Sequence, residues 1–67
     1  MDAVENAVTK LLDRIMSILD RDGKTIGDLA REIGKSYHQT YYWVKVRRFK
    51  PGGDAVLLLK QWADRHA

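Results

Sequence analysis

Apolar residues recur at steps of three and four along almost the whole of this 67-residue chain. Between Val4 and Leu19 they are interrupted by charged residues such as Asp13 and Arg14, which is the spacing of an amphipathic helix with one buried side. No segment shows the strict alternation of apolar and polar residues that a half-buried strand requires. The pattern therefore predicts an all-α fold.

Capping residues and glycines divide this pattern into separate helices. Thr25 and Asp28 have the spacing of a capping box, Ser36 can cap the helix that follows Gly34, and Asp54 is expected to cap the last helix. We predict a single compact four-helix domain covering residues 1–67. Its helices are expected at about residues 2–21, 25–33, 36–46 and 54–66.

Several classes of function lack the residues they need. With no cysteine, the chain has neither a disulfide framework nor a thiolate zinc site, and His38 and His66 stand far apart, so no metal is expected. Ser36 is needed as a helix cap and has no base and third group to activate it, which argues against an enzyme. The glycines lack the spacing of a phosphate-binding loop, so no cofactor is expected. The longest uncharged apolar run, Ala55 to Leu59, is far shorter than the roughly 20 residues of a membrane span. We expect a cytoplasmic protein.

Charge is distributed unevenly along the chain, whose formal net charge is +3. Residues 1–32 hold seven acids and five bases, a net of −2, whereas residues 33–60 hold six bases and one acid, a net of +5. The six bases are Lys35, Lys45, Arg47, Arg48, Lys50 and Lys60. A basic stretch confined to one part of a small domain indicates an anionic partner. A solvated surface without a partner is the alternative explanation.

The spacing of residues around Gly34 is the most informative motif. Ala30 is small enough for a second helix to cross over it, and Gly34 can adopt the left-handed turn that redirects the chain. Trp43, nine residues after Gly34, can pack the second helix back onto the first. These three positions predict a helix-turn-helix at about residues 26–45.

This motif resembles the lambda-repressor/Cro-like helix-turn-helix family of prokaryotic and phage transcriptional regulators. The matching string is Leu29-Ala30-Arg31-Glu32-Ile33-Gly34-Lys35-Ser36, followed by Trp43 and by Pro51 before the last helix. Lys35, Thr40 and Val46 depart from the residues usual in the family. The resemblance implies a repressor that binds double-stranded DNA sequence-specifically, with the second helix of the motif, Ser36 to Val46, in the major groove.

A helical wheel separates two sides of this second helix, which we call the reading helix. Thr40, Trp43, Val44 and Arg47 cluster on one side, which is expected to pack against the rest of the domain. The opposite side, which we call the outer face, carries Tyr37, His38, Gln39, Tyr41, Tyr42 and Lys45. These side chains are long enough to reach base edges in a groove about 12 Å wide. Base readout is expected from Tyr37, His38, Tyr41, Tyr42 and Lys45.

Contacts to the DNA backbone and a second copy of the chain are also expected, with a monomer whose apolar surface is merely scattered as the alternative to the second copy. Phosphate contacts are expected from Thr25, Lys35, Ser36, Gln39, Arg47, Arg48 and Lys50. The first helix is apolar over more than half of its circumference, which predicts a homodimer on a palindromic operator. No small-molecule effector is expected. Two alternatives remain: a protein-interaction module that uses the aromatic outer face, and single-stranded nucleic acid stacked on the tyrosines.

Overall fold

The chain folds into helices joined by short connections. The computed structural model describes residues 3–47 and 51–67, with side chains from Ala7 onward. Its elements are α1 (Ala3–Asp22), α2 (Ile26–Ile33), α3 (Tyr37–Tyr41), the π-helix η1 (Tyr42–Val46) and α4 (Gly53–Arg65). No strand occurs in the described ranges. The predicted all-α domain of four helices is confirmed, with the difference that the reading helix consists of α3 followed by η1.

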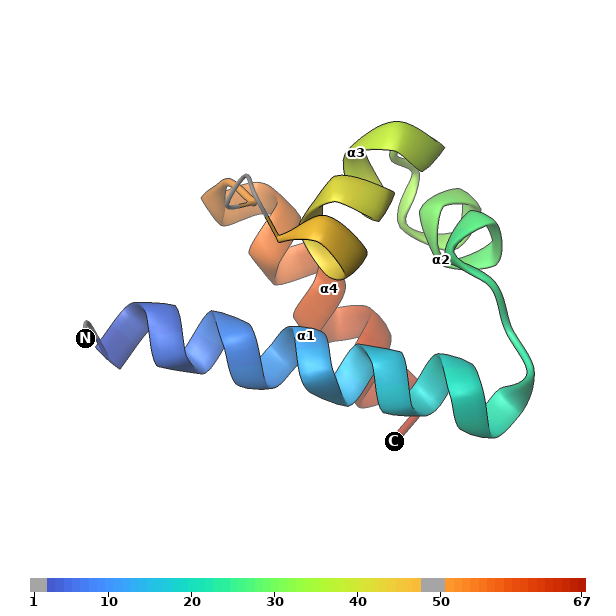
Figure 1. Cartoon of the computed structure of the whole chain (residues 1–67), viewed down its shortest axis with the longest axis horizontal. Helices are drawn as coiled ribbons and strands as arrows, with labels where there is room; N and C mark the ends of the chain where they lie inside the picture. The colour runs from blue at the N-terminus through green and yellow to red at the C-terminus, as the bar shows by residue number, and fades with distance from the viewer. Residues whose placement is uncertain (1–2, 48–50) are drawn as a thin grey trace.

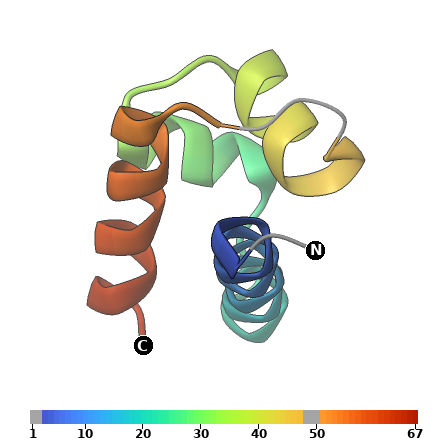
Figure 2. The same ribbon diagram turned by 90° about the vertical axis from the view of Figure 1, so that its left-hand side faces the viewer.

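Helix α1 forms the base of the domain and runs along its longest dimension (Figure 1). The molecule measures 32 × 23 × 19 Å, and a helix of 20 residues is about 30 Å long at 1.5 Å per residue. Helix α4 packs beside α1, while α2 with α3 and η1 forms a layer that crosses them, as the view along α1 shows (Figure 2). None of the helices in the described part of the chain has the length and apolar character that crossing a bilayer demands.

The first two turns between helices form as the sequence predicts. Thr25 Oγ1 accepts from the backbone N–H of Asp28 at 3.1 Å, and Asp28 Oδ2 accepts from that of Thr25 at 3.0 Å, so the capping box is complete. Gly34 has φ 74° and ψ 29°, the left-handed conformation that glycine adopts without steric cost. The N–H of Lys35 then donates to the carbonyl of Ala30, closing the end of α2.

The two later helix starts differ from each other. Ser36 Oγ accepts from the backbone N–H of Gln39 at 3.2 Å, which confirms Ser36 as the cap of α3. The expectation that Asp54 caps α4 is wrong, because the helix begins one residue earlier and its N-cap is Gly52, with no side-chain cap bond. Asp54 already has helical backbone in the first turn, where its carboxylate lies near the positive end of the helix dipole.

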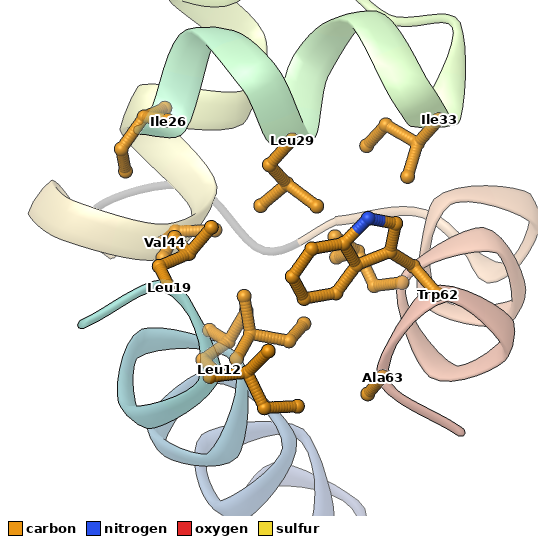
Figure 3. Close-up of a cluster of buried hydrophobic side chains, with 11 residues drawn as sticks. Leu12, Leu19, Ile26, Leu29, Ile33, Val44, Trp62 and Ala63 are labelled. Carbon is orange, nitrogen blue, oxygen red and sulfur yellow. The ribbon is translucent and has the colours of Figure 1, made fainter. Parts of the chain in front are cut away.

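The hydrophobic core lies where α1, α2, η1 and α4 meet. Trp62 of α4 is fully buried and lies between Leu29 and Ile33 of α2 on one side and Leu12 of α1 on the other (Figure 3). Val44 of η1 closes the core from the side of the reading helix. The buried cluster consists of Leu12, Ile15, Ile18, Leu19, Ile26, Leu29, Ile33, Val44, Leu59, Trp62 and Ala63.

Helix α1 buries more of its apolar surface inside the domain than its sequence led us to expect. Leu12, Ile15, Ile18 and Leu19 are buried, and Val8, Leu11 and Met16 pack half-buried against them. Among the described side chains, the large apolar residues that stay exposed are on the reading helix and on α4, where Leu57 is 55% exposed. The short helices thus cover most of the surface on which the homodimer prediction depended.

Candidate nucleic-acid interface

Helices α2 and α3 meet at Gly34 in a helix-turn-helix whose inward side is buried. Ala30 is buried where α3 approaches α2, and Thr40 is fully buried with its hydroxyl donating to the Ser36 carbonyl at 3.0 Å. Val44, one turn further along, lies in the core. These residues confirm the packed side that the helical wheel predicts. They also determine which side of the reading helix is left for solvent.

The two other residues predicted on the packed side lie at its boundary. Trp43 is half-buried and packs against the core, as expected for a residue that holds the reading helix in place. The side chain of Arg47 is one-third exposed, at the end of η1. Of the two tryptophans, Trp62 of α4 is the fully buried one, and it lies outside the motif.

All six residues of the outer face are exposed. Tyr37 and Tyr41, one turn apart, stack with ring centroids 5.9 Å apart and an angle of 24° between their planes. Tyr42 meets Tyr41 edge to face at 6.1 Å, and His38 meets Tyr37 in the same way at 6.1 Å. The four rings contact one another. The outer face therefore presents flat apolar area together with hydroxyl and imidazole groups.

The end of the reading helix is wider than an α-helix. The N–H of Arg47 donates to the carbonyl of Tyr42 at 2.7 Å, a bond that spans five residues instead of four. Arg47 itself has φ 59° and ψ 23°, in the left-handed region. The sequence has no glycine at position 47 to mark a left-handed turn, and a helical wheel assumes α-helical geometry. The π-helix could therefore not be predicted, and only the structure around Val44 and Arg47 reveals it.

The predicted phosphate contacts fall into three groups. Lys35 in the turn is half-buried and forms no ion pair with the residues that the structure describes. The same holds for Lys45, which is predicted for base readout and is exposed. Arg47 Nη1 lies 2.7 Å from Oδ1 of Asp13. Arg48 and Lys50 lie outside the described residues. Among the residues that the structure describes here, the unpaired lysines thus lie on or beside the outer face, whereas Arg47 is already paired.

The uncharged residues predicted to contact phosphate are Thr25, Ser36 and Gln39, and they take part in the caps of α2 and α3. Ser36 Oγ donates to Oε1 of Gln39 at 3.3 Å, so that both side chains are joined at the start of α3. Thr25 is held in its capping box, and the N–H that it donates lowers the pKa of the Asp28 carboxyl below its ordinary value. These contacts keep the first turns of α2 and α3 rigid beside the outer face.

A shallow hollow of about 450 Å³ extends the outer face toward the start of α2. Tyr37, Tyr41 and Lys45 line it on one side. Residues from the end of α1 and the start of α2, including Met16 and Thr25, line the other side. The outer face and the N-terminus of α2 therefore form one continuous surface.

Sequence reasoning missed a second polar cluster, which we call the C-terminal cluster and define as Lys24, Glu32, Trp62 and His66. Glu32 Oε1 accepts from Trp62 Nε1 at 3.3 Å, and Oε2 lies 3.2 Å from Lys24 Nζ. The His66 ring stacks on the indole with centroids 4.2 Å apart. The hydrogen bond from Lys24 holds the pKa of Glu32 below its ordinary value. No sequence spacing signals this cluster, because its members come from the α1–α2 connection, from α2 and from the C-terminal end.

We compared the chain with known proteins by sequence and by structure. No protein-family model, curated protein or solved structure matches it. The resemblance to the helix-turn-helix family therefore stays a prediction from the sequence of residues 26–45.

Proposed function

We propose that this protein is a sequence-specific transcriptional regulator, a cytoplasmic repressor of the phage or prokaryotic kind, that reads the major groove of double-stranded DNA with residues 36–46. The observation that carries the proposal is the contrast between the two sides of the reading helix. Thr40 and Val44 are buried, whereas the six residues of the outer face are all exposed. A helix about 10–12 Å across fits a major groove of about 12 Å.

The chemistry of the outer face suits base edges. Tyr41 and Tyr42 supply hydroxyl groups and flat apolar surface, His38 can donate or accept, and Lys45 donates to guanine acceptors. The neighbouring Lys35 and the helix starts at Thr25 and Ser36 lie where contacts to the DNA backbone would fix the register. Both kinds of contact come from one continuous surface, as DNA recognition requires.

We further propose that two copies act together on a palindromic operator. A single reading helix reaches only one half-site, and a two-fold dimer would place a second one about 34 Å away on the same face of the duplex. Since α1 buries most of its apolar surface in the core, we place the contact between copies at the exposed Leu57 of α4.

Selection of bound duplexes from a random pool tests the proposal directly. We expect an enriched sequence with two half-sites, and we expect log affinity to fall with log salt at a slope near −3 per bound monomer if three or four phosphates are neutralised. Lys45→Ala should weaken binding to the selected duplex more than Lys60→Ala, which removes an exposed lysine of α4. Equal affinity for selected and random duplex, or equal effects of the two variants, would contradict sequence-specific reading by the outer face.

The stacked tyrosines favour a second candidate, a protein-interaction module on the same fold. Tyr37 is 51% exposed, Tyr42 41% and Tyr41 37%, and tyrosine is enriched at the centres of protein interfaces. A module of this kind would show no salt-dependent affinity for duplex. Tighter binding to an unpaired strand than to the same sequence as a duplex would indicate single-stranded nucleic acid instead.

A further inference from the structure

Arg47 ends the reading helix in a backbone conformation that non-glycine residues rarely adopt. Its φ of 59° is the single positive value among the described residues other than glycine. Its N–H donates to the Tyr42 carbonyl, so this conformation closes the last turn of η1. The left-handed region is sterically unfavourable for a residue with a side chain, and it persists where surrounding contacts enforce it.

Those contacts come from the guanidinium group of the same residue. Nη1 lies 2.7 Å from Oδ1 of Asp13 on α1, and Nε donates to the carbonyl of Val44 at 3.0 Å. Val44 is a core residue of η1, and η1 lies against α1 (Figure 1). The side chain of Arg47 therefore joins the last turn of the reading helix to the long helix beneath it.

We propose that Arg47 is a positioning residue, which fixes the end of the reading helix against α1 and gives its charge to Asp13 instead of to a DNA phosphate. This inference rests on the proposed function, and it replaces the phosphate contact that the sequence led us to expect at Arg47. A planar guanidinium can donate to the carboxylate and the carbonyl together. A phosphate that captured it would leave the Asp13 carboxylate without its cation, and that loss opposes the exchange.

The two roles of Arg47 predict opposite effects of Asp13→Asn. If Arg47 positions the helix, loss of the Asp13 carboxylate loosens the reading helix and weakens binding to the selected duplex. If Arg47 contacts phosphate, the variant releases its guanidinium and binding becomes tighter. Asp64→Asn is the matched control, because it also removes an exposed carboxylate that pairs with an arginine, here Arg14 of α1.

The salt dependence of binding separates the same two roles at Arg47 itself. Arg47→Gly keeps the left-handed turn accessible. We expect this variant to lower affinity by about two- to fivefold, the scale of one exposed ion pair. We expect its slope of log affinity against log salt to equal that of Lys60→Ala. A phosphate contact would reduce the slope by about 0.9 for each monomer. That reduction, or tighter binding by Asp13→Asn than by Asp64→Asn, would overturn the inference.

Amide hydrogen exchange of the DNA-free protein keeps this test separate from the test of the function. Without the ion pair, the last turn of η1 should open more often, so Asp13→Asn should exchange the amides of Val46 and Arg47 about two- to fivefold faster than Asp64→Asn does. Equal exchange rates would contradict the positioning role whether or not the protein binds DNA. Failure of the wild-type protein to bind any duplex would refute the proposed function alone.

Discussion

The outer face and the C-terminal cluster use similar side chains in opposite ways. Each combines aromatic rings with charged or polar groups, and in each the rings stack, Tyr37 on Tyr41 in one and His66 on Trp62 in the other. In the C-terminal cluster Trp62 Nε1 donates to Glu32 across α4 and α2, and Nδ1 of His66 lies 2.8 Å from the carbonyl oxygen of Trp62. On the outer face Lys45 forms no ion pair with any described residue and the tyrosine rings stay exposed.

Burial explains the difference between these two regions. The indole of Trp62 is fully buried, so its N–H needs a partner within the protein, and Glu32 supplies one. Water can reach the hydroxyl groups of Tyr37 and Tyr41, whose rings are exposed on the outer face. Stacked rings thus occur both in a buried cluster and on an exposed face, so stacking by itself does not identify a binding surface.

Truncating one aromatic residue in each region should give the largest difference in the free energy of unfolding between the two regions. Trp62→Ala is expected to lower the free energy of unfolding by about 3–5 kcal/mol, which is comparable to the whole stability of a chain of this size. Tyr37→Ala should change it by no more than about 0.5 kcal/mol, because the ring is half exposed. Urea unfolding followed by circular dichroism measures both values. If Trp62→Ala does not fold, Trp62→Phe provides the comparison, and equal losses in Trp62→Phe and Tyr37→Ala would contradict it.

Glu32→Ala should have the next largest effect. It leaves the indole N–H without its acceptor, and we expect a loss of about 1 kcal/mol, the low end for such a change, because the one-third exposed side chain of Glu32 lets water approach. Glu32→Gln keeps an acceptor and should lose less. Lys45→Ala on the outer face should leave thermal stability unchanged. A loss in Glu32→Gln as large as in Glu32→Ala would show that charge, not the hydrogen bond to Trp62, stabilises the cluster.

The smallest expected effect is the pH dependence that comes from Asp28. Hydrogen bonds from Thr25 lower its pKa in the folded state below the ordinary value of 3.8. Its contribution to stability is therefore complete above about pH 4 and is lost as the pH falls through the folded-state pKa. Asp28→Asn retains an acceptor but cannot titrate, so the free energies of unfolding of variant and wild type should converge between pH 5 and about pH 2. Parallel curves would show that the capping box is not the source of this acid sensitivity.

Local signals predicted the helices and the two sides of the reading helix correctly. Thr25, Ser36 and Gly34 act within a few residues along the chain, so their effect can be recognised without knowledge of the fold. The inward position of Thr40 and Val44 also follows from helical periodicity alone. The outer face was predictable because it consists of the residues of the reading helix that do not lie on its packed side.

Contacts between distant segments could not be predicted in this way. The ion pair of Arg47 with Asp13 joins residues that lie far apart in the sequence. No sequence pattern near either residue predicts its partner. The extent to which α1 is covered also depends on how three short helices pack on it, which no periodicity describes.

The sequence by itself determined which segments are helical, where α2 and α3 begin, and which side of each helix is apolar, because backbone hydrogen bonding and capping act over three or four residues. Only the tertiary structure decided how the charges are used. Packing placed Asp13 beside Arg47 and Glu32 beside Trp62, and it left Lys45 and the tyrosines facing solvent. An ion pair forms wherever the fold brings opposite charges within about 4 Å, and that distance depends on the whole chain.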